Sequence, residues 1–458
     1  MQISVLTIKK TESLRLALKR IDENCCGTIF VTDKNGSVIG VATDGDIRRY
    51  LISGGSLDDA VIKCANREFT WESPQTPREI LLKHLDHKIR VIPLLDQSRR
   101  LVDFVSRDYV PIQKENRLYA RARAPVRISF SGGGSDLTHF FYHNGDGAVI
   151  NTTVTIFSHA SLHIRTDSKV VINSLDLRET LYADDLNVAL KSQGRFGLIL
   201  AVLKLINPTF GFELNIHSDF PLSSGLGGSA VVSAAILGCF NQFRNDQWDL
   251  HELAEIAYQA ERHTLSIAGG WQDQYAAVFG GFNFMEFRRD QNLIQPLRIP
   301  RDTRIELEES LLLCDTGTIH DSGNIHNDQR NEMSSEKIRE MVKENVKICY
   351  IMRDYLLKGN LIGFGNLLDK SWQLKRRFCE KISTSKLDLI YSEAKTNGAI
   401  GGKLLGAGGG GFFIFYVPPK KRLQLVQHIE SNGLKIRPFQ FDSDGLQSWR
   451  VREYQDIE

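Results

Sequence analysis

Residues 221–230 read Pro-Leu-Ser-Ser-Gly-Leu-Gly-Gly-Ser-Ala, and an apolar run at 231–240 follows directly. Glycines allow backbone N–H groups to turn inward and approach a ligand closely. The apolar run predicts a helix, whose positive N-terminal end favours an anion such as phosphate. The stretch matches neither G-x-x-x-x-G-K-[ST] nor G-x-G-x-x-G at a first βα turn. It predicts a phosphate-binding loop of another type, and a tight turn into a buried helix is the alternative.

The composition is that of an ordinary soluble globular protein. The chain has 458 residues, 42% hydrophobic and 24% charged, with a net charge of +2, so roughly two to four domains are expected and neither nucleic acid nor a membrane surface is a favoured partner. No apolar run reaches the ~20 residues that span a bilayer, and the first residues lack a signal-peptide pattern. The seven cysteines are scattered without C-x-x-C, which favours reduced thiols over a disulfide framework or zinc site. We expect a cytoplasmic protein.

The first 112 residues show one pattern twice. In the first copy a helical segment at 11–24 precedes a strand at 27–32, a turn with Asn-Gly chemistry at 33–36, a strand at 37–42 and a helix at 47–52. The second copy, over 76–109, repeats the strand-turn-strand-helix order. The polar stretch 113–120 has no clear periodicity and is predicted to be a linker.

The G-V-A-T-x-x-D pattern at 40–46 of the first copy resembles a CBS motif. The resemblance implies that Thr43 and Asp46 hold the phosphate and ribose of an adenine nucleotide. In the second copy Asp103 replaces the glycine and Tyr109 the aspartate, which counts against nucleotide binding there. We expect a CBS pair over 1–112, with a purely structural or homodimer-forming role as an equal alternative to ligand sensing.

A second glycine-rich stretch lies between a strand and a carboxylate. The strand at 123–130 alternates apolar and polar residues and runs into Ser-Gly-Gly-Gly-Ser-Asp at 131–136. The glycines leave space for a ligand, and Asp136 presents a carboxylate that accepts hydrogen bonds from sugar hydroxyls. A glycine-rich hairpin capped by an aspartate is the structural alternative.

Two acidic residues follow the phosphate loop in the chain. Glu261 ends a helix that starts with a capping box at 249–252, and such a glutamate is most often a solvated surface group. Asp273 lies within Gly-Gly-Trp-Gln-Asp-Gln at 269–274, where the structural alternative is the N-cap of a helix at 274–279.

The last third of the chain alternates strands and helices. We expect a strand at 310–317, helices at 333–358, 361–378, 386–395 and 421–431, and a strand at 434–441. A polar segment begins at 320. Lys375, Arg376 and Arg377 place three cations together; they form either a solvated cationic helix face or a clamp for a substrate phosphate. A third glycine-rich stretch, 401–412, precedes a strand at 413–417.

The three glycine-rich stretches, in this order, resemble the motifs of the GHMP small-molecule kinases, which include galactokinase, homoserine kinase and mevalonate kinase. The wording R-A-P-V-R-I-S-F-S-G-G-G-S-D-L at 123–137 is most similar to that of the D-glycero-D-manno-heptose 7-phosphate kinases. The resemblance implies an α+β, two-lobed fold. It has an S5-like first half over 121–300 and a ferredoxin-like second half over 301–458, preceded by the CBS pair.

The resemblance also implies roles for individual residues and the cofactors ATP and Mg²⁺. Asp273 would be the general base, and Arg127 would steady negative charge near the reacting oxygen. ATP phosphates would contact Pro221, Ser223, Ser224, Gly225, Leu226, Gly227, Gly228, Ser229 and Ala230. Ser229 and Glu261 would hold Mg²⁺, which takes one or two protein oxygens beside the phosphates. The sugar would contact Gly133, Gly134, Ser135, Asp136, Gly270, Lys375, Gly408 and Gly409.

The activity that the resemblance implies is transfer of the ATP γ-phosphoryl group to the anomeric hydroxyl of D-glycero-D-manno-heptose 7-phosphate, giving the 1,7-bisphosphate for a nucleotide-activated heptose. The residues by themselves favour an ATP-dependent sugar kinase, because phosphoryl transfer needs positioning, charge neutralisation and a proton acceptor. An L-fucokinase-like or other sugar 1-kinase has the same motifs. A catalytically idle nucleotide-binding regulator built on the CBS pair belongs to a different class.

Overall fold

The computed structural model describes residues 5–85, 89–110, 118–221, 224–318, 332 and 335–451. The chain divides into two compact units, Met1–Glu115 and Asn116–Glu458, and each is described by itself. None of the helices that the structure describes is both long and apolar enough to cross a membrane.

The first unit contains two short sheets. Strand β1 pairs in parallel with β2, which pairs with β3 in antiparallel fashion, while β4 and β5 form a separate hairpin. A core that includes Leu14, Ile29 and Ile47 lies between the three-stranded sheet and its helices. The elements are β1 Thr7–Lys9, α1 Leu14–Asn24, β2 Thr28–Thr32, β3 Val38–Thr43, α2 Asp44–Ile52, the 3₁₀ turn η2 Val61–Lys63, α3 Arg78–His84, β4 Val91–Leu95 and β5 Leu101–Ser106.

Thr43 and Asp46 form the capping box of α2 in this unit. The Asp46 carboxylate accepts hydrogen bonds from the Thr43 backbone N–H at 2.9 Å and from the Thr43 hydroxyl at 2.6 Å. The two side chains therefore have a structural task, and nucleotide binding by them stays a prediction. The second repeat departs from the expected order, because residues 107–110 after β5 form no helix.

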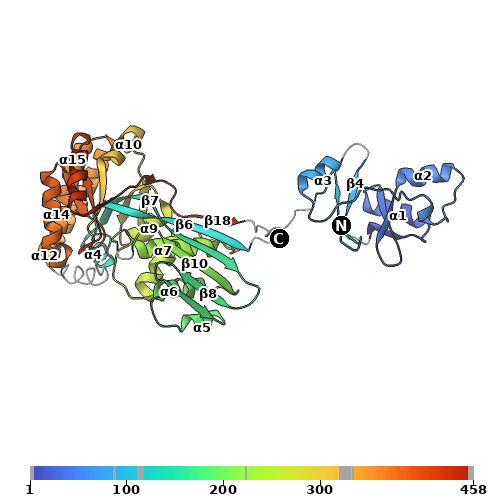
Figure 1. Cartoon of the computed structure of the whole chain (residues 1–458), viewed down its shortest axis with the longest axis horizontal. Helices are drawn as coiled ribbons and strands as arrows, with labels where there is room; N and C mark the ends of the chain where they lie inside the picture. Colours follow the sequence, from blue (N-terminus) through green and yellow to red (C-terminus); the bar gives the residue numbers. More distant parts are fainter. Residues whose placement is uncertain are drawn as a thin grey trace. The chain divides into compact units, whose positions relative to one another are not determined.

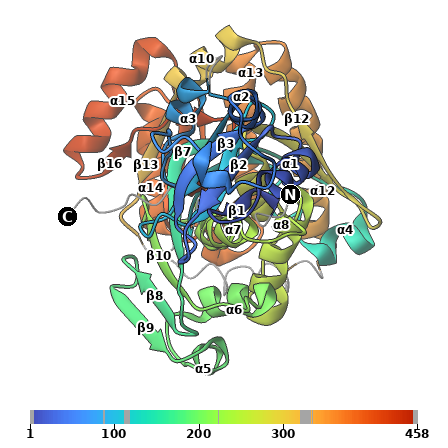
Figure 2. The same ribbon diagram turned by 90° about the vertical axis from the view of Figure 1, so that its right-hand side faces the viewer.

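The first lobe of the second unit is built on a nine-stranded sheet (Figure 1). Its central strand β7 pairs with β6 along one side and with β10 and β11 along the other, and β8, β9 and α5 lie together at one end (Figure 2). The elements are β6 Tyr119–Ser131, α4 Thr138–Asn144, β7 Gly147–Ile164, β8 Val170–Ser174, β9 Glu179–Ala183, α5 Leu186–Leu190, α6 Gly197–Ile206, β10 Phe212–Ser218, α7 Gly228–Asn241, α8 Leu250–Gln259, the π turn η3 Ala260–Thr264, α9 Gln272–Phe279, β11 Phe282–Phe287, β12 Asn292–Pro296 and α10 Arg301–Ser310.

Helix α7 is the apolar helix predicted after the phosphate loop, and it lies against β6 and β7 (Figure 1). Nearly every side chain from Ala230 to Asn241 is buried, because α6, α8 and α9 pack around it as well. A helix that is apolar on all sides must be enclosed in this way. Its burial holds the N-terminal end, and the loop before it, in one place.

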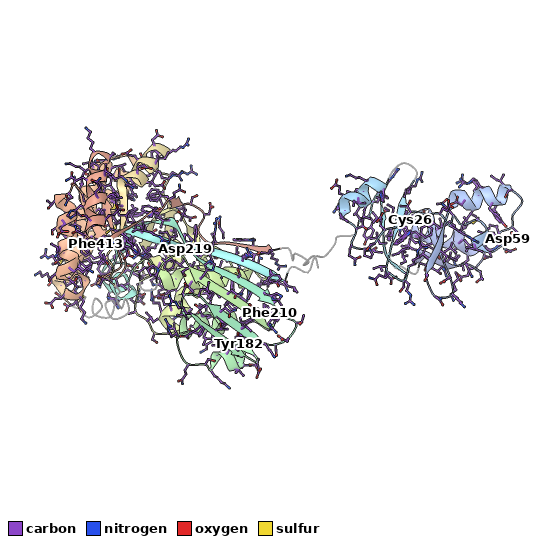
Figure 3. The ribbon with its side chains drawn as sticks, viewed as in Figure 1. Cys26, Asp59, Tyr182, Phe210, Asp219 and Phe413 are labelled. Carbon is purple, nitrogen blue, oxygen red and sulfur yellow. The ribbon has the colours of Figure 1, made fainter. Side chains whose placement is uncertain are left out.

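The second lobe has the predicted ferredoxin-like arrangement. Its four-stranded antiparallel sheet has the order β14-β15-β13-β16, and helices separate β13 from β14 and β15 from β16, as in a split βαβ pair. Phe413, fully buried at the centre of this lobe, packs edge-on against Trp372 at 5.6 Å (Figure 3). The elements are β13 Leu311–Asp315, α12 Glu336–Leu357, α13 Leu361–Lys375, the 3₁₀ turn η4 Glu380–Ile382, α14 Ser385–Thr396, β14 Gly401–Leu404, β15 Phe412–Tyr416, α15 Pro419–Ser431, β16 Lys435–Arg437, β17 Phe441–Asp442 and β18 Gln447–Val451.

The end of the chain differs from the sequence-based expectation. The strand predicted at 434–441 is two strands in different sheets, because β16 pairs with β13 whereas β17 pairs with β7. Strand β18 then pairs with β6. Strands β17 and β18 therefore belong to the sheet of the first lobe, although they lie within 301–458, the range predicted for the second half. Strand β6 begins at Tyr119, inside the predicted linker, and α13 ends at Lys375 rather than at 378.

Candidate active site

The phosphate loop ends in two glycines with left-handed backbone conformations. Gly225 and Gly227 have φ angles of 76° and 82°, a region that residues with a side chain rarely adopt. Gly227 is the N-cap of α7, so the unpaired N–H groups of the first turn face the loop. The hydroxyl of Ser224 is buried and has no hydrogen-bond partner among the described residues, which suits contact with a phosphate oxygen.

Arg127, which is buried, and Asp273, whose side chain is 22% exposed, form a bidentate ion pair beside this loop. The Arg127 Nε and Nη2 atoms each donate to one carboxylate oxygen of Asp273 at 2.8 Å, and Nη1 donates to the Gly225 carbonyl at 2.8 Å. Only 3% of Arg127 is exposed. Asp273 lies in the first turn of α9 and Trp271 is the N-cap, so the N-cap alternative for Asp273 is wrong.

Asp136 is a buried carboxylate, fixed by backbone N–H groups. Gly134 N donates to Oδ1 at 3.0 Å and Gln272 N donates to Oδ2 at 3.3 Å. Burial raises the pKa of Asp136, the charge of Asp273 raises it further, and the two N–H groups oppose this. A Cβ at Gly270 would lie 1.8 Å from Asp136 Oδ2, so only glycine permits this close approach. Each carboxylate oxygen of Asp136 keeps a second acceptor site, which suits it to accept hydrogen bonds from sugar hydroxyls.

Glu261 lies in the π turn that follows α8 and is 5% exposed. It accepts a hydrogen bond from Gln274 Nε2 at 2.9 Å, and Arg262 Nη1 lies 3.1 Å from its Oε1. Burial raises the pKa of Glu261, and the adjacent Arg262 guanidinium opposes this. The alternative of a solvated surface glutamate is therefore wrong, and the Ser229 hydroxyl also acts to lower the pKa of Glu261.

Lys375 reaches the same site from the second lobe. It is 4% exposed, and its ammonium donates to the Gly406 carbonyl. Burial lowers the pKa of Lys375 to about 8, Arg127 lowers it further, and Asp136 and Asp273 oppose this. A Cβ at Gly133 would lie 3.8 Å from Lys375 Nζ, so this ammonium lies over the triple glycine.

The other two cations after α13 do not accompany Lys375. Arg376 pairs with Asp388 at 2.5 Å, and Arg377 is exposed. The predicted solvated cationic face is therefore wrong for Lys375, and a clamp built from all three residues is not formed.

A further buried cation, Lys403, was not among the predicted site residues. Its ammonium donates to the Ser129 carbonyl at 2.7 Å, and burial and the charge of Lys375 lower its pKa.

The third glycine-rich stretch brings the second lobe onto the phosphate loop. A Cβ at Gly406 would lie 2.6 Å from Gly225 Cα, and one at Gly411 would lie 2.2 Å from the Ser224 carbonyl oxygen. Gly408 and Gly409, which were predicted to contact the sugar, instead pack on Ile382: Gly409 N donates to its carbonyl at 2.9 Å. The approach between the lobes is therefore made by the first and last glycines of the 406–411 segment.

The sugar contact predicted for Ser135 does not fit the structure, and the predictions for Ser223 and for the segment from 320 concern residues that the structure does not describe. The Ser135 hydroxyl is fully buried and donates to the carbonyls of Gly132 and Ala148 at 2.7 and 3.0 Å, so it fastens the loop to β7 instead of facing a ligand. Ser223 and the polar segment that begins at 320 lie outside the described residues.

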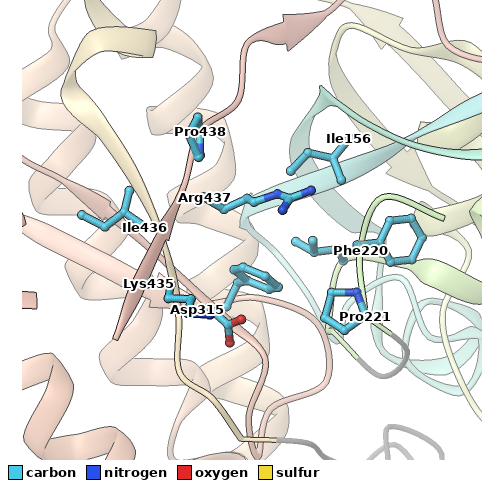
Figure 4. Close-up of a pocket in the computed structure, with 10 residues that line it drawn as sticks. Ile156, Phe220, Pro221, Asp315, Lys435, Ile436, Arg437 and Pro438 are labelled. Atoms are coloured by element: carbon cyan, nitrogen blue, oxygen red, sulfur yellow. The ribbon is translucent and has the colours of Figure 1, made fainter. Parts of the chain in front are cut away.

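A separate hollow of about 180 Å³ lies where the two lobes meet (Figure 4). Phe220, Pro221 and Leu226 line it from the first lobe, while Lys435 and Arg437 line it from the second. Arg437 also donates to the Asp219 carbonyl at 2.6 Å. The residues lining this hollow include none of the carboxylates described above.

Comparison with known proteins identifies the family. Residues 196–281 match the GHMP kinase N-terminal domain, residues 352–432 match the GHMP kinase C-terminal domain, and residues 1–53 match the CBS domain. The D-glycero-alpha-D-manno-heptose 7-phosphate kinase of Campylobacter jejuni is 32% identical over 337 residues, which are 72% of this chain and 99% of that protein. The chain belongs to the GHMP kinase family.

Two further relatives of this GHMP kinase are named as kinases of sugars. The L-fucokinase/L-fucose-1-P guanylyltransferase of Bacteroides fragilis is 26% identical over 317 residues, 62% of this chain and 33% of that protein. The crystal structure of a D-glycero-D-manno-heptose 1-phosphate kinase from Bacteroides thetaiotaomicron superimposes with a TM-score of 0.60 at 26% identity, covering 73% of this chain and 100% of that one.

The family and its relatives show that this GHMP kinase is an ATP-dependent sugar kinase. The site described above has two sides, one formed by the phosphate loop and Glu261, which are predicted to bind ATP and Mg²⁺, and the other by Asp136 and Lys375, which are predicted to bind the sugar. Arg127 and Asp273 lie between them, since Arg127 bonds the Gly225 carbonyl on one side and the charges of Asp136 and Lys375 act on the other.

Proposed function

We propose that the protein transfers the γ-phosphoryl group of ATP to the anomeric hydroxyl of D-glycero-D-manno-heptose 7-phosphate. The observation that carries the proposal is the 32% identity to a kinase of that name, over 99% of its length. Lys375 adds physical support, because a buried ammonium beside the sugar-binding Asp136 gives the substrate phosphate an opposite charge. A neutral sugar has no need of such a cation.

In the proposed mechanism the protein supplies positioning, electrostatics and a proton acceptor, which is what phosphoryl transfer requires. Asp136 accepts hydrogen bonds from sugar hydroxyls and orients the ring. Asp273 accepts the proton of the attacking hydroxyl. Both Asp273 oxygens bind Arg127, but each carboxylate oxygen has a second acceptor site, so a hydroxyl can still bond to it. The fixed guanidinium stabilises charge that develops at the reacting oxygen.

Mg²⁺ fits the residues that the structure brings together. Serine and glutamate oxygens are hard ligands that suit this cation. Ser229 lies in the first turn of α7, and its hydroxyl acts on the pKa of Glu261 in the π turn after α8. Within the described part of the chain, no three His, Cys, Asp or Glu side chains are arranged to hold a metal. Ser229 and Glu261 would therefore hold Mg²⁺ only together with ATP phosphates and water. The ion would neutralise phosphate charge there.

The test is ATP consumption with a panel of acceptors: D-glycero-D-manno-heptose 7-phosphate, mannose, fucose, galactose and buffer alone. Asp273→Asn is assayed beside the wild type with each acceptor. Lys375→Met is included, with Lys370→Met as its control, because Lys370 is on the same helix but is half exposed and pairs with Glu344 at 2.9 Å.

Turnover of heptose 7-phosphate alone, lost in Asp273→Asn and weakened in Lys375→Met, is the expected result. Turnover of fucose or another neutral sugar instead would keep the mechanism but reject the phosphosugar. No turnover with any acceptor would reject the proposed substrate and favour the idle regulator.

A further inference from the structure

Arg262 contacts both Glu261 and the carbonyl of Gly270, the residue that lies against Asp136. It follows Glu261 in the π turn Ala260–Thr264, a kind of turn that is frequent at functional sites. Its side chain is 9% exposed, and Nη1 lies 3.1 Å from Glu261 Oε1. Neither the motifs of the sequence nor the family comparison draws attention to this residue.

Arg262 Cζ also lies 5.9 Å from the centroid of the Tyr258 ring, and its hydrogen bonds are with the backbone that follows the π turn. Nη1 donates to the Ile267 and Ala268 carbonyls at 3.3 and 3.5 Å, and Nη2 donates to the Gly270 carbonyl at 3.3 Å. A Cβ at Gly269 would lie 2.3 Å from Arg262 Cζ. Residues 267–270, which we call the glycine segment, therefore fold closely over the guanidinium.

The glycine segment forms one wall of the sugar site. Gly270 lies against the Asp136 carboxylate so closely that a Cβ would be 1.8 Å from Oδ2, and Gln272 N donates to the same oxygen at 3.3 Å. The backbone before the segment is strained, because Ser266 has a φ of 56° and a residue with a side chain rarely adopts this region. Backbone hydrogen bonds hold the two ends of this stretch, from Ile267 N to the Glu261 carbonyl at 3.1 Å and from Trp271 N to the Asp136 carbonyl at 3.3 Å. The Arg262 guanidinium supplies the contacts to the carbonyls between them.

We infer that Arg262 is a positioning residue for the sugar, because its guanidinium holds the glycine segment against Asp136. Arginine suits the task because its planar group donates several hydrogen bonds in fixed directions, whereas a lysine is a single point charge. A lysine in its place keeps a charge for Glu261 but cannot bridge the carbonyls of residues 267, 268 and 270. The inference rests on the sugar kinase activity, not on a particular sugar.

The test compares wild type with Arg262→Lys, Arg262→Ala and the control Arg244→Ala. Arg244 also forms an ion pair with an acidic neighbour, Asp246 at 2.7 Å, and stacks on the ring of Trp248. It therefore makes the same types of contact as Arg262 but in a different part of the lobe. Apparent KM values are measured for MgATP and for heptose 7-phosphate, or for the neutral sugar of the panel that the wild type phosphorylates. Failure of heptose 7-phosphate as substrate is thereby kept separate from failure of the inference.

We expect both Arg262 variants to raise the sugar KM at least tenfold. Arg262→Lys should leave the MgATP KM within about threefold, because Glu261 keeps a cationic neighbour as well as Ser229 and Gln274. Amide hydrogen exchange over 267–271 should accelerate in both Arg262 variants and stay unchanged in Arg244→Ala.

Chemical rescue distinguishes a missing contact from general damage. Arg262 lines a cavity of about 560 Å³ together with the exposed residues Tyr142, His263 and Ser266, so a small cation can reach the space left by truncation. Added guanidinium, at millimolar concentrations far below those that unfold proteins, should lower the sugar KM of Arg262→Ala and not that of the wild type. A wild-type sugar KM in Arg262→Lys would overturn the inference, as would equal increases of both KM values in Arg262→Ala without rescue.

Discussion

Replacing Lys375 by methionine should make the enzyme more stable and a poorer binder of a phosphorylated sugar. The Lys375 ammonium is buried, and its pKa is lowered from 10.5 to about 8, first by burial and then by Arg127. The folded protein therefore holds this charge unfavourably at neutral pH. Methionine has a similar length, fills the same space and carries no charge.

The size of the effect follows from the difference between the two pKa values. A fall from 10.5 to about 8 corresponds to about 3 kcal/mol of lost stability at pH 7, at ~1.4 kcal/mol per pKa unit. The variant also loses the hydrogen bond to the Gly406 carbonyl, which lowers its free energy of unfolding by ~1 kcal/mol. The net gain in free energy of unfolding is then about 2 kcal/mol, or a rise in Tm of ~3 °C for a unit of this size.

The sign of the pH dependence is fixed by the lowered pKa. Below pH ~8 the wild type carries the unfavourable charge in full. Between pH ~8 and ~10.5 the folded state has released the proton while the unfolded state still binds it, so wild-type stability rises with pH. The advantage of Lys375→Met should therefore be largest at pH 7, vanish near pH ~10 and reverse slightly above it, where the lost hydrogen bond outweighs what remains of the charge penalty.

Thermal and urea unfolding at pH 7, 8.5 and 10 measure this difference, with Lys370→Met as the exposed control that should change stability by less than ~0.5 kcal/mol. In kinetic assays at pH 7, Lys375→Met should raise the KM of the phosphorylated sugar at least tenfold. The reasoning would be refuted by a variant that unfolds at or below the wild-type temperature, or by a stability difference that does not shrink as the pH rises.

Two further substitutions test the phosphate loop and the chemistry. Asp273→Asn should lower kcat by 10²–10⁴ because the amide cannot take up the hydroxyl proton; a loss below tenfold would show that positioning alone suffices. Gly411→Ala should raise the MgATP KM at least tenfold, since its Cβ would lie 2.2 Å from the Ser224 carbonyl oxygen. Gly433→Ala is the matched control, with a φ of 75° and nothing within 4 Å of its Cβ: it shares the backbone strain and should leave MgATP binding unchanged.

The local parts of this protein could be predicted from the sequence. The phosphate loop and α7 are continuous in the chain, and their glycines and apolar run follow rules that act over a few residues. The same holds for the strand and triple glycine that end at Asp136, and for the helices and strands of most of both lobes. Because these features depend on neighbours in the chain, their residue types were enough to predict them.

The contacts between distant segments were decided only by the tertiary structure. Arg127 and Asp273 are 146 residues apart, and no periodicity indicates that they form a bidentate pair. Likewise, Lys375 looked like one of three solvated cations until the packing of α13 buried it alone, and the roles within the 406–411 glycines depended on which of them meets the phosphate loop. Burial and charge neighbours arise only when the lobes pack together. The sequence alone therefore determined which kinds of groups the enzyme carries, and the fold decided which of them share one desolvated site.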